Sequence, residues 1–587
     1  MFKQTLSALI LAMACTPALA IDYIVTRSDD PNPDVITLPG CRPEGGCSLR
    51  QAILASNKRV GADRIVLRRS TTYTLSRTTQ STTVDGRSGP LLVTDELEIV
   101  GTGSDRNRIE WQSNLHHSHT VLVHGVLNTL TISPPLALRD VTIANGRGEF
   151  GGCLRTRNGT ELGLYGVVVE NCRGRLGGGL SSGTPSLVIY ESYIRNNLAT
   201  QDGGGIHFSS SVTVIATRAA VLNNHANRDG GGIAAEGLYL AGSSSGTASV
   251  VWRSASGPSD FWDNRADGNG GAIAVGLAST LNMFRLPANP IRSHFLRNSA
   301  GATGGAISMK SYKGTLSASA LTLEDTLLLD NVAAEGGAIA TSGGQSLIVS
   351  SEFQENHAQS GAGGAVLFSA IDDPASNVIR QSSFNANSAS LRGGAIASVC
   401  QPLVVRDGSL WGNVGPSGSA VYAAGQTALT SVTTASHGSQ ALTKGYHTAC
   451  GNQPFQITNS VIAESDRCST VVGGVSSGGG NFYSASAPGC NFINGLDFMH
   501  SVTDLGLRAD TFGGERLVLG WDNDGQVRPQ VNAGISSQCS SVDGRGFPRN
   551  DGACDSGAFE QQTPSASTFA RTVALWPLGA PFAVFQS

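Results

Sequence analysis

Asparagine and glycine recur in a short repeat between residues 151 and 421, and this repeat constrains the fold more than any other feature. In each unit, Asn stands three positions after an aliphatic or aromatic residue, and a Gly-Gly-Ala or Gly-Gly-Gly triplet with a closing aliphatic residue follows after a short turn. The closing residues Leu180, Ile206 and Ile233 are 26 and 27 positions apart, and other units are longer. A period in the twenties that tolerates insertions indicates a solenoid with one coil per unit.

The residue types predict that each coil consists of short strands. Ile, Val, Leu and Phe are flanked by Gly and Asn, and the repeat lacks the 3.6-residue apolar period of a helix. Coils of this kind stack at about 4.8 Å, the distance between paired strands, so equivalent side chains lie directly above one another. We therefore predict an all-β fold, a single parallel β-solenoid.

The recurring Asn and Gly residues have structural explanations. An Asn amide at one corner of every coil can bond to its counterparts above and below, and a Gly pair permits positive φ where a Cβ would clash. We predict a structural ladder in preference to a ligand site. The predicted ladder residues are Asn171, Asn197, Asn224, Asn264, Asn298, Asn331, Asn356, Asn387 and Asn413.

The repeat also resembles a known family. The pairs Phe-x-x-Asn and Gly-Gly-Ala-Ile, as in Phe295 to Asn298 and Gly304 to Ile307, are similar to the repeat of the chlamydial polymorphic outer membrane proteins. This resemblance implies a right-handed parallel β-helix that is displayed outside the cell. It implies nothing specific about an activity.

Residues 1–20 have the layout of a secretory signal peptide. Lys3 precedes an apolar stretch from Leu6 to Ala14, and Ala18-Leu19-Ala20 fits a cleavage site. A lipoprotein signal at Cys15 is the alternative, disfavoured because Ala12 stands where a lipobox usually carries Leu. No later stretch reaches the ~20 apolar residues of a membrane helix. We predict an exported protein, extracellular or on the outer cell surface.

The cysteines are consistent with export. Without Cys15, ten remain, and an even number in an exported chain indicates disulfides, whose connectivity the sequence does not fix. No pair has CxxC spacing, which disfavours zinc or redox chemistry. Proximity suggests pairing Cys41 with Cys47, Cys153 with Cys172, Cys400 with Cys450, Cys468 with Cys490, and Cys539 with Cys554.

A second resemblance lies near the start of the mature chain. The segment from Cys47 to Ile53 reads Cys-Ser-Leu-Arg-Gln-Ala-Ile and resembles the Cys-Ser-Leu-Arg-Glu-Ala-Ile motif that opens many exported bacterial β-helix proteins, with Gln51 in place of Glu. It marks residues 21–110 as an N-terminal cap with the first coils. The spacing of apolar residues from Ser48 to Asn57 predicts a short amphipathic helix over the end of the solenoid, with Arg50 in a buried ion pair.

The solenoid is expected to span residues 111–500, most regularly between 151 and 421. Residues 501–560 contain Asp543-Gly544-Arg545-Gly546 and the segment Cys554 to Glu560, which resemble the choice-of-anchor Q module. This predicts a looser C-terminal region that contains disulfides. The tail, residues 561–587, is apolar but interrupted by prolines and lacks a basic end, which argues against sorting to an anchor.

The composition argues against nucleic acid or anionic lipid as a partner, and the spacing of the histidines argues against a metal site. Charged residues make up only 14% of the chain, the net charge is −4, and no basic run occurs, so nucleic acid and anionic lipid are not expected as the main partner. The histidine cluster of His116, His117, His119 and His124 has no carboxylate or Cys at ligand spacing. We predict no metal and no cofactor.

An enzymatic role would require convergent groups. A glycosidase uses two carboxylates about 5 to 5.5 Å or 6.5 to 9.5 Å apart. The best pair is Asp202 and Asp229, each before a Gly triplet and expected on neighbouring coils. Asp before Gly is also ordinary turn chemistry, which we favour here. Insertions at Leu238 to Pro258, Leu277 to Pro290 and Ser308 to Ala318 are the predicted contact loops.

The sequence thus favours a non-enzymatic, adhesin-like β-solenoid that interacts with host or environmental glycans or surface proteins. The alternative is a polysaccharide lyase or glycoside hydrolase on the same scaffold. Fold alone does not separate the two.

Overall fold

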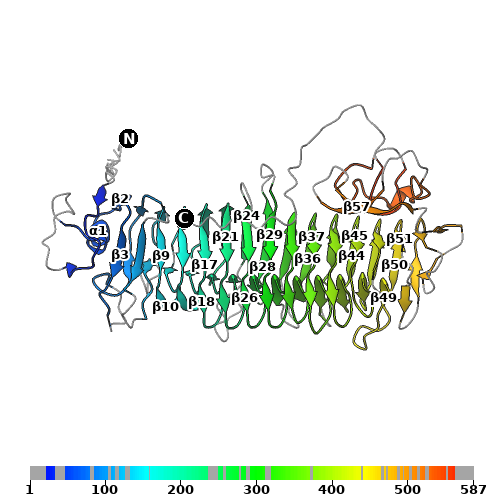
Figure 1. Ribbon diagram of the computed structural model, residues 1–587, viewed down its shortest axis with the longest axis horizontal. Helices are drawn as coiled ribbons and strands as arrows, with labels where there is room; N and C mark the ends of the chain where they lie inside the picture. The colour runs from blue at the N-terminus through cyan, green and yellow to red at the C-terminus, as the bar shows by residue number, and fades with distance from the viewer. Residues whose placement is uncertain are drawn as a thin grey trace, which may run out of the picture.

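The computed structural model of this chain is a parallel β-helix, drawn in Figure 1. It describes residues 21–33, 46–79, 85–103, 107–112, 118–125, 132–157, 159–235, 249–254, 259–276, 279–285, 291–310, 319–370, 375–437, 440–463, 468–470, 474–484, 490–492, 495–501, 505–511, 516–521, 528–549 and 553–561. The predicted signal peptide, Cys41, His116, His117 and residues 562–587 lie outside these ranges.

Each regular coil visits four parallel sheets in turn, which we number I to IV. Sheet I contains β1 (Asp22–Ile24), β2 (Asp63–Val66), β5 (Leu97–Val100), β8 (Leu136–Arg139), β12 (Glu161–Tyr165), β16 (Ser186–Tyr190), β20 (Val212–Thr217), β24 (Ser249–Ser254), β28 (Thr280–Arg285), β32 (Ala320–Glu324), β36 (Gln345–Val349), β40 (Asn377–Arg380), β44 (Leu403–Arg406), β47 (Thr427–Thr430), β50 (Phe455–Thr458), β53 (Val475–Ser477) and β55 (Cys490–Asn491).

Sheet II follows sheet I across a sharp corner. Its strands are β3 (Thr72–Leu75), β6 (Arg108–Trp111), β9 (Thr142–Ala144), β13 (Val168–Glu170), β17 (Tyr193–Arg195), β21 (Ala219–Leu222), β25 (Ser259–Trp262), β29 (Ser293–Leu296), β33 (Thr326–Leu329), β37 (Glu352–Gln354), β41 (Ser383–Asn385), β45 (Ser409–Trp411), β48 (Thr433–Ala435), β51 (Val461–Ala463), β54 (Phe482–Tyr483) and β56 (Phe498–Met499).

Sheet III is narrow and occurs only in the central coils. It contains β10 (Arg147–Phe150), β14 (Arg173–Leu176), β18 (Leu198–Ala199), β22 (His225–Ala226), β26 (Arg265–Ala266), β30 (Ser299–Ala300), β34 (Val332–Ala333), β38 (His357–Ala358) and β42 (Ser388–Ala389).

Sheet IV closes each coil after the Gly triplet. It contains β4 (Leu91–Val93), β7 (Leu122–His124), β11 (Leu154–Thr156), β15 (Leu180–Ser182), β19 (Ile206–Phe208), β23 (Ile233–Ala235), β27 (Ile273–Val275), β31 (Ile307–Lys310), β35 (Ile339–Ser342), β39 (Val366–Ser369), β43 (Ile396–Val399), β46 (Val421–Ala423), β49 (Leu442–Lys444) and β52 (Cys468–Thr470).

The interior is built from vertical columns of like side chains, and the predicted all-β fold is confirmed. The closing aliphatic residues pair in register from coil to coil, as Ile206 does with Ile233, and are buried. A second buried column contains stacked rings, with the centroids of Phe261 and Phe295 4.6 Å apart and nearly parallel. Stacking of identical apolar groups removes them from water and fixes the register, because a one-residue slip would turn them outward.

A continuous asparagine ladder runs along one corner of the stack. The Nδ2 of each Asn from Asn197 to Asn387 donates to the Oδ1 of the next Asn at 2.9–3.1 Å, ending at Asn413. The same Nδ2 atoms also donate to a backbone carbonyl of the previous coil, as Asn298 does to Phe261 at 2.8 Å. At its far end, the backbone N–H of Asn413 donates to Nδ1 of His437. The ladder thus satisfies polar groups that the bend leaves unpaired.

The predicted ladder position at Asn171 is wrong by one residue. Asn171 has a left-handed backbone, with φ of 56°, and the next residue, Cys172, occupies the ladder column, where its N–H donates to Oδ1 of Asn197. The sulfur of Cys172 is bonded to Cys153 instead of continuing the amide chain. The disulfide therefore replaces the ladder in the first regular coil.

The N-terminal cap is the helix α1 (Leu49–Ser56). Ser48 and Gln51 form a capping box, in which each side chain bonds the other residue's backbone N–H. Arg50 is fully buried, pairs through two nitrogens with Asp30 at 2.7 and 2.9 Å, and donates to the carbonyls of Gly86, Gly89 and Pro90. The predicted helix and buried ion pair are both present.

The predicted contact loops are in part regular strands. β24 lies inside Leu238 to Pro258, β28 lies inside Leu277 to Pro290, and both pair with neighbouring strands of sheet I. Much of the remainder of these segments lies outside the described residues. None of the described helices has the length and apolar character that a membrane crossing requires.

Removal of one ladder amide should destabilise the solenoid. In Asn298→Ala, the side-chain bonds to Asn264, Asn331 and Phe261 disappear, and the buried groups left behind should cost roughly 2–4 kcal/mol. Denaturant unfolding of the mature chain would measure this loss. The matched control is Asn227→Ala at an exposed bend, and equal unfolding midpoints for the two variants would contradict a stabilising ladder.

Candidate functional site

The sequence-predicted carboxylates Asp202 and Asp229 lie on neighbouring coils, as expected, but both are engaged in ion pairs. Asp202 is fully buried, accepts from Nε of Arg228 at 2.7 Å, and accepts the backbone N–H of Asp229 at 3.1 Å. Asp229 accepts from Nζ of Lys310 at 2.7 Å and from the backbone and side-chain nitrogens of Asn269. These contacts pin the loop that follows sheet III.

The electrostatics of Asp229 fit this structural role. Burial raises the pKa of its carboxyl, but hydrogen bonds from Lys310 and Asn269 outweigh burial, so the net pKa lies below its ordinary value. A carboxylate that is held ionised by a neighbouring ammonium is a poor general acid. Asp229 is therefore a poor proton donor for glycoside hydrolysis.

The described histidines of the predicted cluster are also structural. The ring of His119 is tilted against that of Trp111, with centroids 5.3 Å apart, and its Nε2 accepts the backbone N–H of Thr79. His124 is buried, with Nε2 2.7 Å from the carbonyl oxygen of Pro134. Burial lowers the pKa of both, which leaves neutral rings in the wall of the solenoid.

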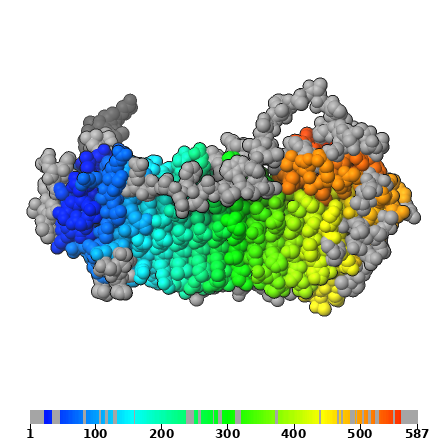
Figure 2. Space-filling model, viewed as in Figure 1, coloured from blue at the N-terminus to red at the C-terminus, as the bar shows by residue number. Residues whose placement is uncertain are grey.

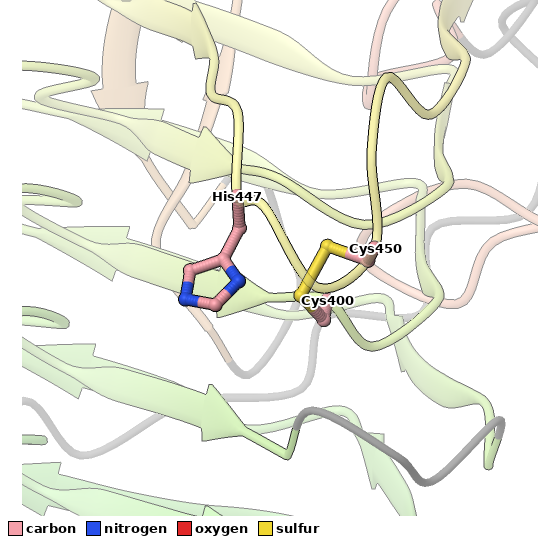
Figure 3. Close-up of side chains that lie close together, drawn as sticks. All are labelled: Cys400, His447 and Cys450. Atoms are coloured by element: carbon pink, nitrogen blue, oxygen red, sulfur yellow. A yellow bond between two sulfur atoms is a disulfide. The ribbon is translucent and has the colours of Figure 1, made fainter.

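Within the described part of the chain, one further group has metal-ligand chemistry: Cys400, His447 and Cys450, whose ligand atoms lie within 4.8 Å of one another. Figure 3 shows that the two sulfurs are joined to each other beside the imidazole. A disulfide sulfur is not a thiolate and does not ligate metal as one does. In this oxidised form, the disulfide covalently links the end of β43 to the loop after β49.

Disulfides join the pairs that sequence proximity suggested wherever both partners are described. They link Cys153 to Cys172, Cys400 to Cys450, Cys468 to Cys490, and Cys539 to Cys554. Cys47 is also disulfide-bonded, and its predicted partner Cys41 lies outside the described residues.

The outer face of sheet II gathers the charged side chains that could form a site. At one end, Arg108 bonds Glu110 and Glu170 at 2.5 and 2.6 Å, and Arg195 bonds Glu170 at 2.9 Å. Burial lowers the pKa of Arg108 and raises that of Glu170, but the ion pairs outweigh burial in both cases. Both groups are therefore held charged.

Further along the same face is a group that sequence reasoning missed, the sheet II cluster: Asp260, Arg292, His294 and Glu352. Nδ1 of His294 lies 2.8 Å from Oδ1 of Asp260 on the neighbouring coil, and both side chains are partly buried. Arg292 reaches across two coils to Oε2 of Glu352 at 2.6 Å. Asp260, His294 and Glu352 share one outward column, which only the strand register reveals.

The Asp260–His294 pair has the arrangement of an oriented base. When Asp260 accepts from Nδ1–H, it fixes the tautomer in which Nε2 of His294 is a proton acceptor. Among the described residues, no other hydrogen bond to this imidazole is present. Arg292 precedes β29, and its guanidinium extends to Glu352, two coils beyond His294.

The C-terminal module, the described part of residues 505–561, covers the far end of this face. Figures 1 and 2 show it seated on the solenoid over the last coils. It includes β57 (Arg508–Asp510), β58 (Val518–Gly520) and the short 3-10 helix η2 (Ser536–Gln538). The backbone N–H of Leu519 donates to Oγ of Ser409, and that of Ala558 donates to Oγ1 of Thr433. Half-buried Trp411 packs against the same interface.

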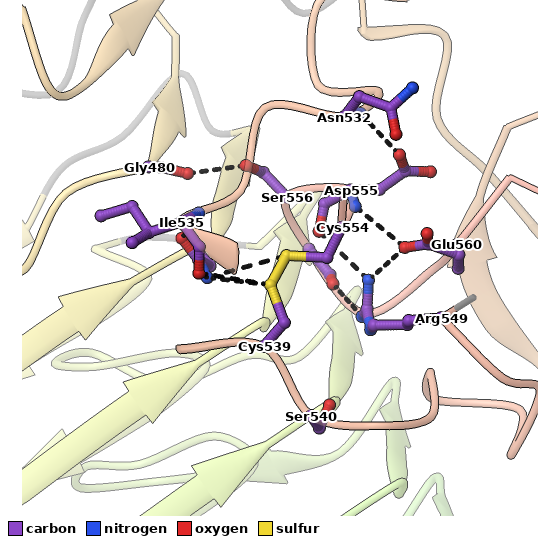
Figure 4. Close-up of a disulfide and its surroundings, with 12 residues drawn as sticks. Gly480, Asn532, Ile535, Cys539, Ser540, Arg549, Cys554, Asp555, Ser556 and Glu560 are labelled. Atoms are coloured by element: carbon purple, nitrogen blue, oxygen red, sulfur yellow. Dashed lines mark hydrogen bonds and ion pairs between the residues drawn. A yellow bond between two sulfur atoms is a disulfide. The ribbon is translucent and has the colours of Figure 1, made fainter. Parts of the chain in front are cut away.

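A buried charge network fastens the module. Arg549 donates to Oε2 of Glu560 at 2.7 Å and to Oδ1 of Asp407 in the solenoid at 3.4 Å. Ser540 also donates to Asp407, and the backbone N–H of Asp555 donates to Glu560. Figure 4 shows Arg549 pointing at Glu560 beside the Cys539–Cys554 disulfide, which closes the loop that carries Ser540 and Arg549.

The carboxyls of this network have raised pKa values. Burial raises the pKa of Asp407 to about 6, although Arg549 and Ser540 act in the opposite direction. Burial likewise raises the pKa of Glu560 to about 7, against the bonds from Asp555 and Arg549. Both carboxyls therefore hold a proton more tightly in the folded protein than in an unfolded chain.

Comparisons with known proteins add little to this geometry. No protein-family model matches the chain, and no curated protein is found to be similar. Among solved structures, the chain is similar to the crystal structure of pectate lyase Pel9A, with 12% identity, a TM-score of 0.23, and coverage of 93% of this chain and 98% of that one. A similarity at this level carries no argument about activity.

The module should be docked most firmly in mild acid. Because the folded pKa values of Asp407 and Glu560 exceed their ordinary values of 3.8 and 4.5, the stability that they contribute is fully present below those values and is lost as pH rises toward about 7. Limited proteolysis of the module should therefore be slower at pH 5 than at pH 7.5. The double variant Asp407→Asn, Glu560→Gln should have a flatter profile, and the opposite pH trend in the unmodified protein would refute the assignment.

Proposed function

We propose that this protein is exported and acts as an adhesin-like β-solenoid, binding an extended extracellular ligand along the outer face of sheet II. The observation that carries the proposal is two separate groups of charged side chains on this face, with uncharged positions such as Ala220 and Leu222 on the coil between them. One group contains Arg108, Glu110, Glu170 and Arg195, and the other is the sheet II cluster. An extended polymer can contact many coils at once, so weak contacts at each coil add up.

Two further features support this assignment. The disulfides fit a protein that works in an oxidising compartment, consistent with the signal peptide expected in residues 1–20. The C-terminal module occupies the same face at one end and is held there through backbone and hydroxyl contacts of the kind that a partner could also make. Host or environmental glycans and surface proteins are the ligands we propose.

A second candidate function is polysaccharide cleavage, and the Asp260–His294 pair is the observation that favours it. In a β-elimination on a uronate polymer, Nε2 of His294 would take the C5 proton, the C4–O4 bond would break, and the leaving oxygen would receive a proton from water. The sequence-predicted acids Asp202 and Asp229 have no part in this scheme.

A combined binding and product assay separates the two functions. The mature chain would be applied to a glycan array and incubated with uronate and neutral polysaccharides, with unsaturated products and new reducing ends measured. A binding protein gives retained glycan and no product. A lyase gives unsaturated product that falls at least a hundredfold in His294→Asn and Asp260→Asn.

Matched controls are available within the chain. His225 on sheet III pairs through Nε2 with Asp267, just after β26, at 3.1 Å. This pair lies away from the sheet II cluster, so His225→Asn should leave any activity unchanged. Asp202→Asn should also leave product formation intact. Product that disappears in Asp202→Asn but persists in His294→Asn would exclude the sheet II cluster, and a chain that retains no glycan or protein ligand would overturn the binding function.

A further inference from the structure

A separate group of exposed aromatic and aliphatic side chains lies at the corner between sheets I and II. Tyr190 at the end of β16 is 40% exposed, Tyr193 at the start of β17 is 45% exposed, and Ile215 on β20 is 38% exposed. Between the two tyrosines, Glu191 adopts a left-handed backbone with φ of 47°, which makes the bend sharp. Tyr190 and Tyr193 therefore lie on either side of one bend, and Ile215 lies on the next strand of sheet I, opposite Val188.

A third ring extends this surface to the preceding coil. Tyr165 is the register partner of Tyr190, and it is half-buried because it lies across Gly163, where a Cβ would come within 2.5 Å of its Cε2. The guanidinium of Arg139 lies 4.0 Å from the centroid of the Tyr165 ring. We call Tyr165, Tyr190, Tyr193 and Ile215 the tyrosine corner.

The charges around the tyrosine corner neutralise one another. Arg139 is paired with Glu98, Arg218 with Glu191, and Arg195 with Glu170. These ion pairs offer hydrogen-bond donors and acceptors to a ligand, but their charges cancel. The site therefore does not attract a polyanion electrostatically. A neutral ligand with an apolar side and many hydroxyls is the better complement.

Size distinguishes a saccharide from a protein partner. The surface extends over two coil spacings, about 10 Å along the axis. A stable protein interface buries about 800 Å² on each partner, far more than these four side chains can offer. A few linked sugar rings fit this length, since the C–H side of a pyranose packs on an aromatic ring while its hydroxyls bond the flanking Arg and Glu groups.

We infer that the tyrosine corner is a binding site for neutral pyranose polysaccharides. The site is separate from the charged sheet II cluster, and its contact groups are Tyr190 and Tyr193, with Tyr165 and Ile215 at its edges. It goes beyond the proposed function by assigning an uncharged sugar as ligand to a defined set of residues.

The test uses the full mature chain and four hexasaccharides as probes: cellohexaose, xylohexaose, mannohexaose and the acidic hexagalacturonate. Titration calorimetry should detect binding of at least one neutral probe, weakened at least tenfold in Tyr190→Ala and in Tyr193→Ala. Tyr190→Phe should retain binding, because ring packing and not the hydroxyl carries the contact. Thermal unfolding should be unchanged in all three, since both side chains project into solvent.

Tyr446→Ala is the matched control, because Tyr446 is 42% exposed and follows β49, many coils away. Unchanged binding in this variant supports the inference. Failure of every neutral probe to bind would overturn it, as would tighter binding of hexagalacturonate or equal losses in Tyr446→Ala and Tyr190→Ala. The tyrosine variants could lose binding of the neutral probes while His294→Asn still binds its ligand. That result would leave the proposed function at the sheet II cluster unaffected.

Discussion

Vertical register between coils is the constraint on which the whole molecule depends. A parallel stack has no hairpins to align its strands, so the alignment must come from side chains that recognise their equivalents one coil away. The asparagine ladder does this with bonds of fixed length and direction, and the stacked Phe and Ile columns do it by shape. Neither device is effective in a single coil. Stability is therefore shared between neighbours, as in other repeat architectures.

Two kinds of end close this stack. At the N-terminus, α1 covers the exposed coil, and the buried Arg50–Asp30 pair ties the helix to the surrounding loops. Near the C-terminus, the ladder ends at His437, and the solenoid continues in less regular coils to β56. The C-terminal module then returns to the side of the stack instead of its tip, bringing Leu519 to Ser409 over a separation of 110 residues. The C-terminal module therefore covers the outer face of sheet II near β45 and β48 and limits the exposed part of that face.

The sequence predicted the features that repeat and missed those that do not. Leu180, Ile206 and Ile233 recur at regular intervals, so their common column follows from spacing alone. At the first ladder position the residue is Cys172, which forms a disulfide and is not Asn. The sequence pattern therefore selected the neighbouring Asn171 by mistake. The pairing of Asp260 with His294 depends on register across a unit of 34 residues whose outward positions carry no pattern. For Asp202 and Asp229, the sequence predicted their place on neighbouring coils. It did not predict their ion-pair partners, Arg228 and Lys310.

At the bend between sheets I and II, the backbone adopts a left-handed conformation that the fold requires, whereas the side chain is free to vary. In this corner Glu191, Arg218, Asp325, Ser350, Gln381 and Asp407 all adopt positive φ at equivalent bends, although none is glycine. Since the backbone is held there by the strands on either side, the side chain at each bend is left to the solvent or to a neighbour. Surface features on different coils are therefore separated by whole numbers of coils, as Tyr193 and Asp260 are separated by two. A polymer that lies along this face would therefore meet different groups at positions that are whole numbers of coils apart.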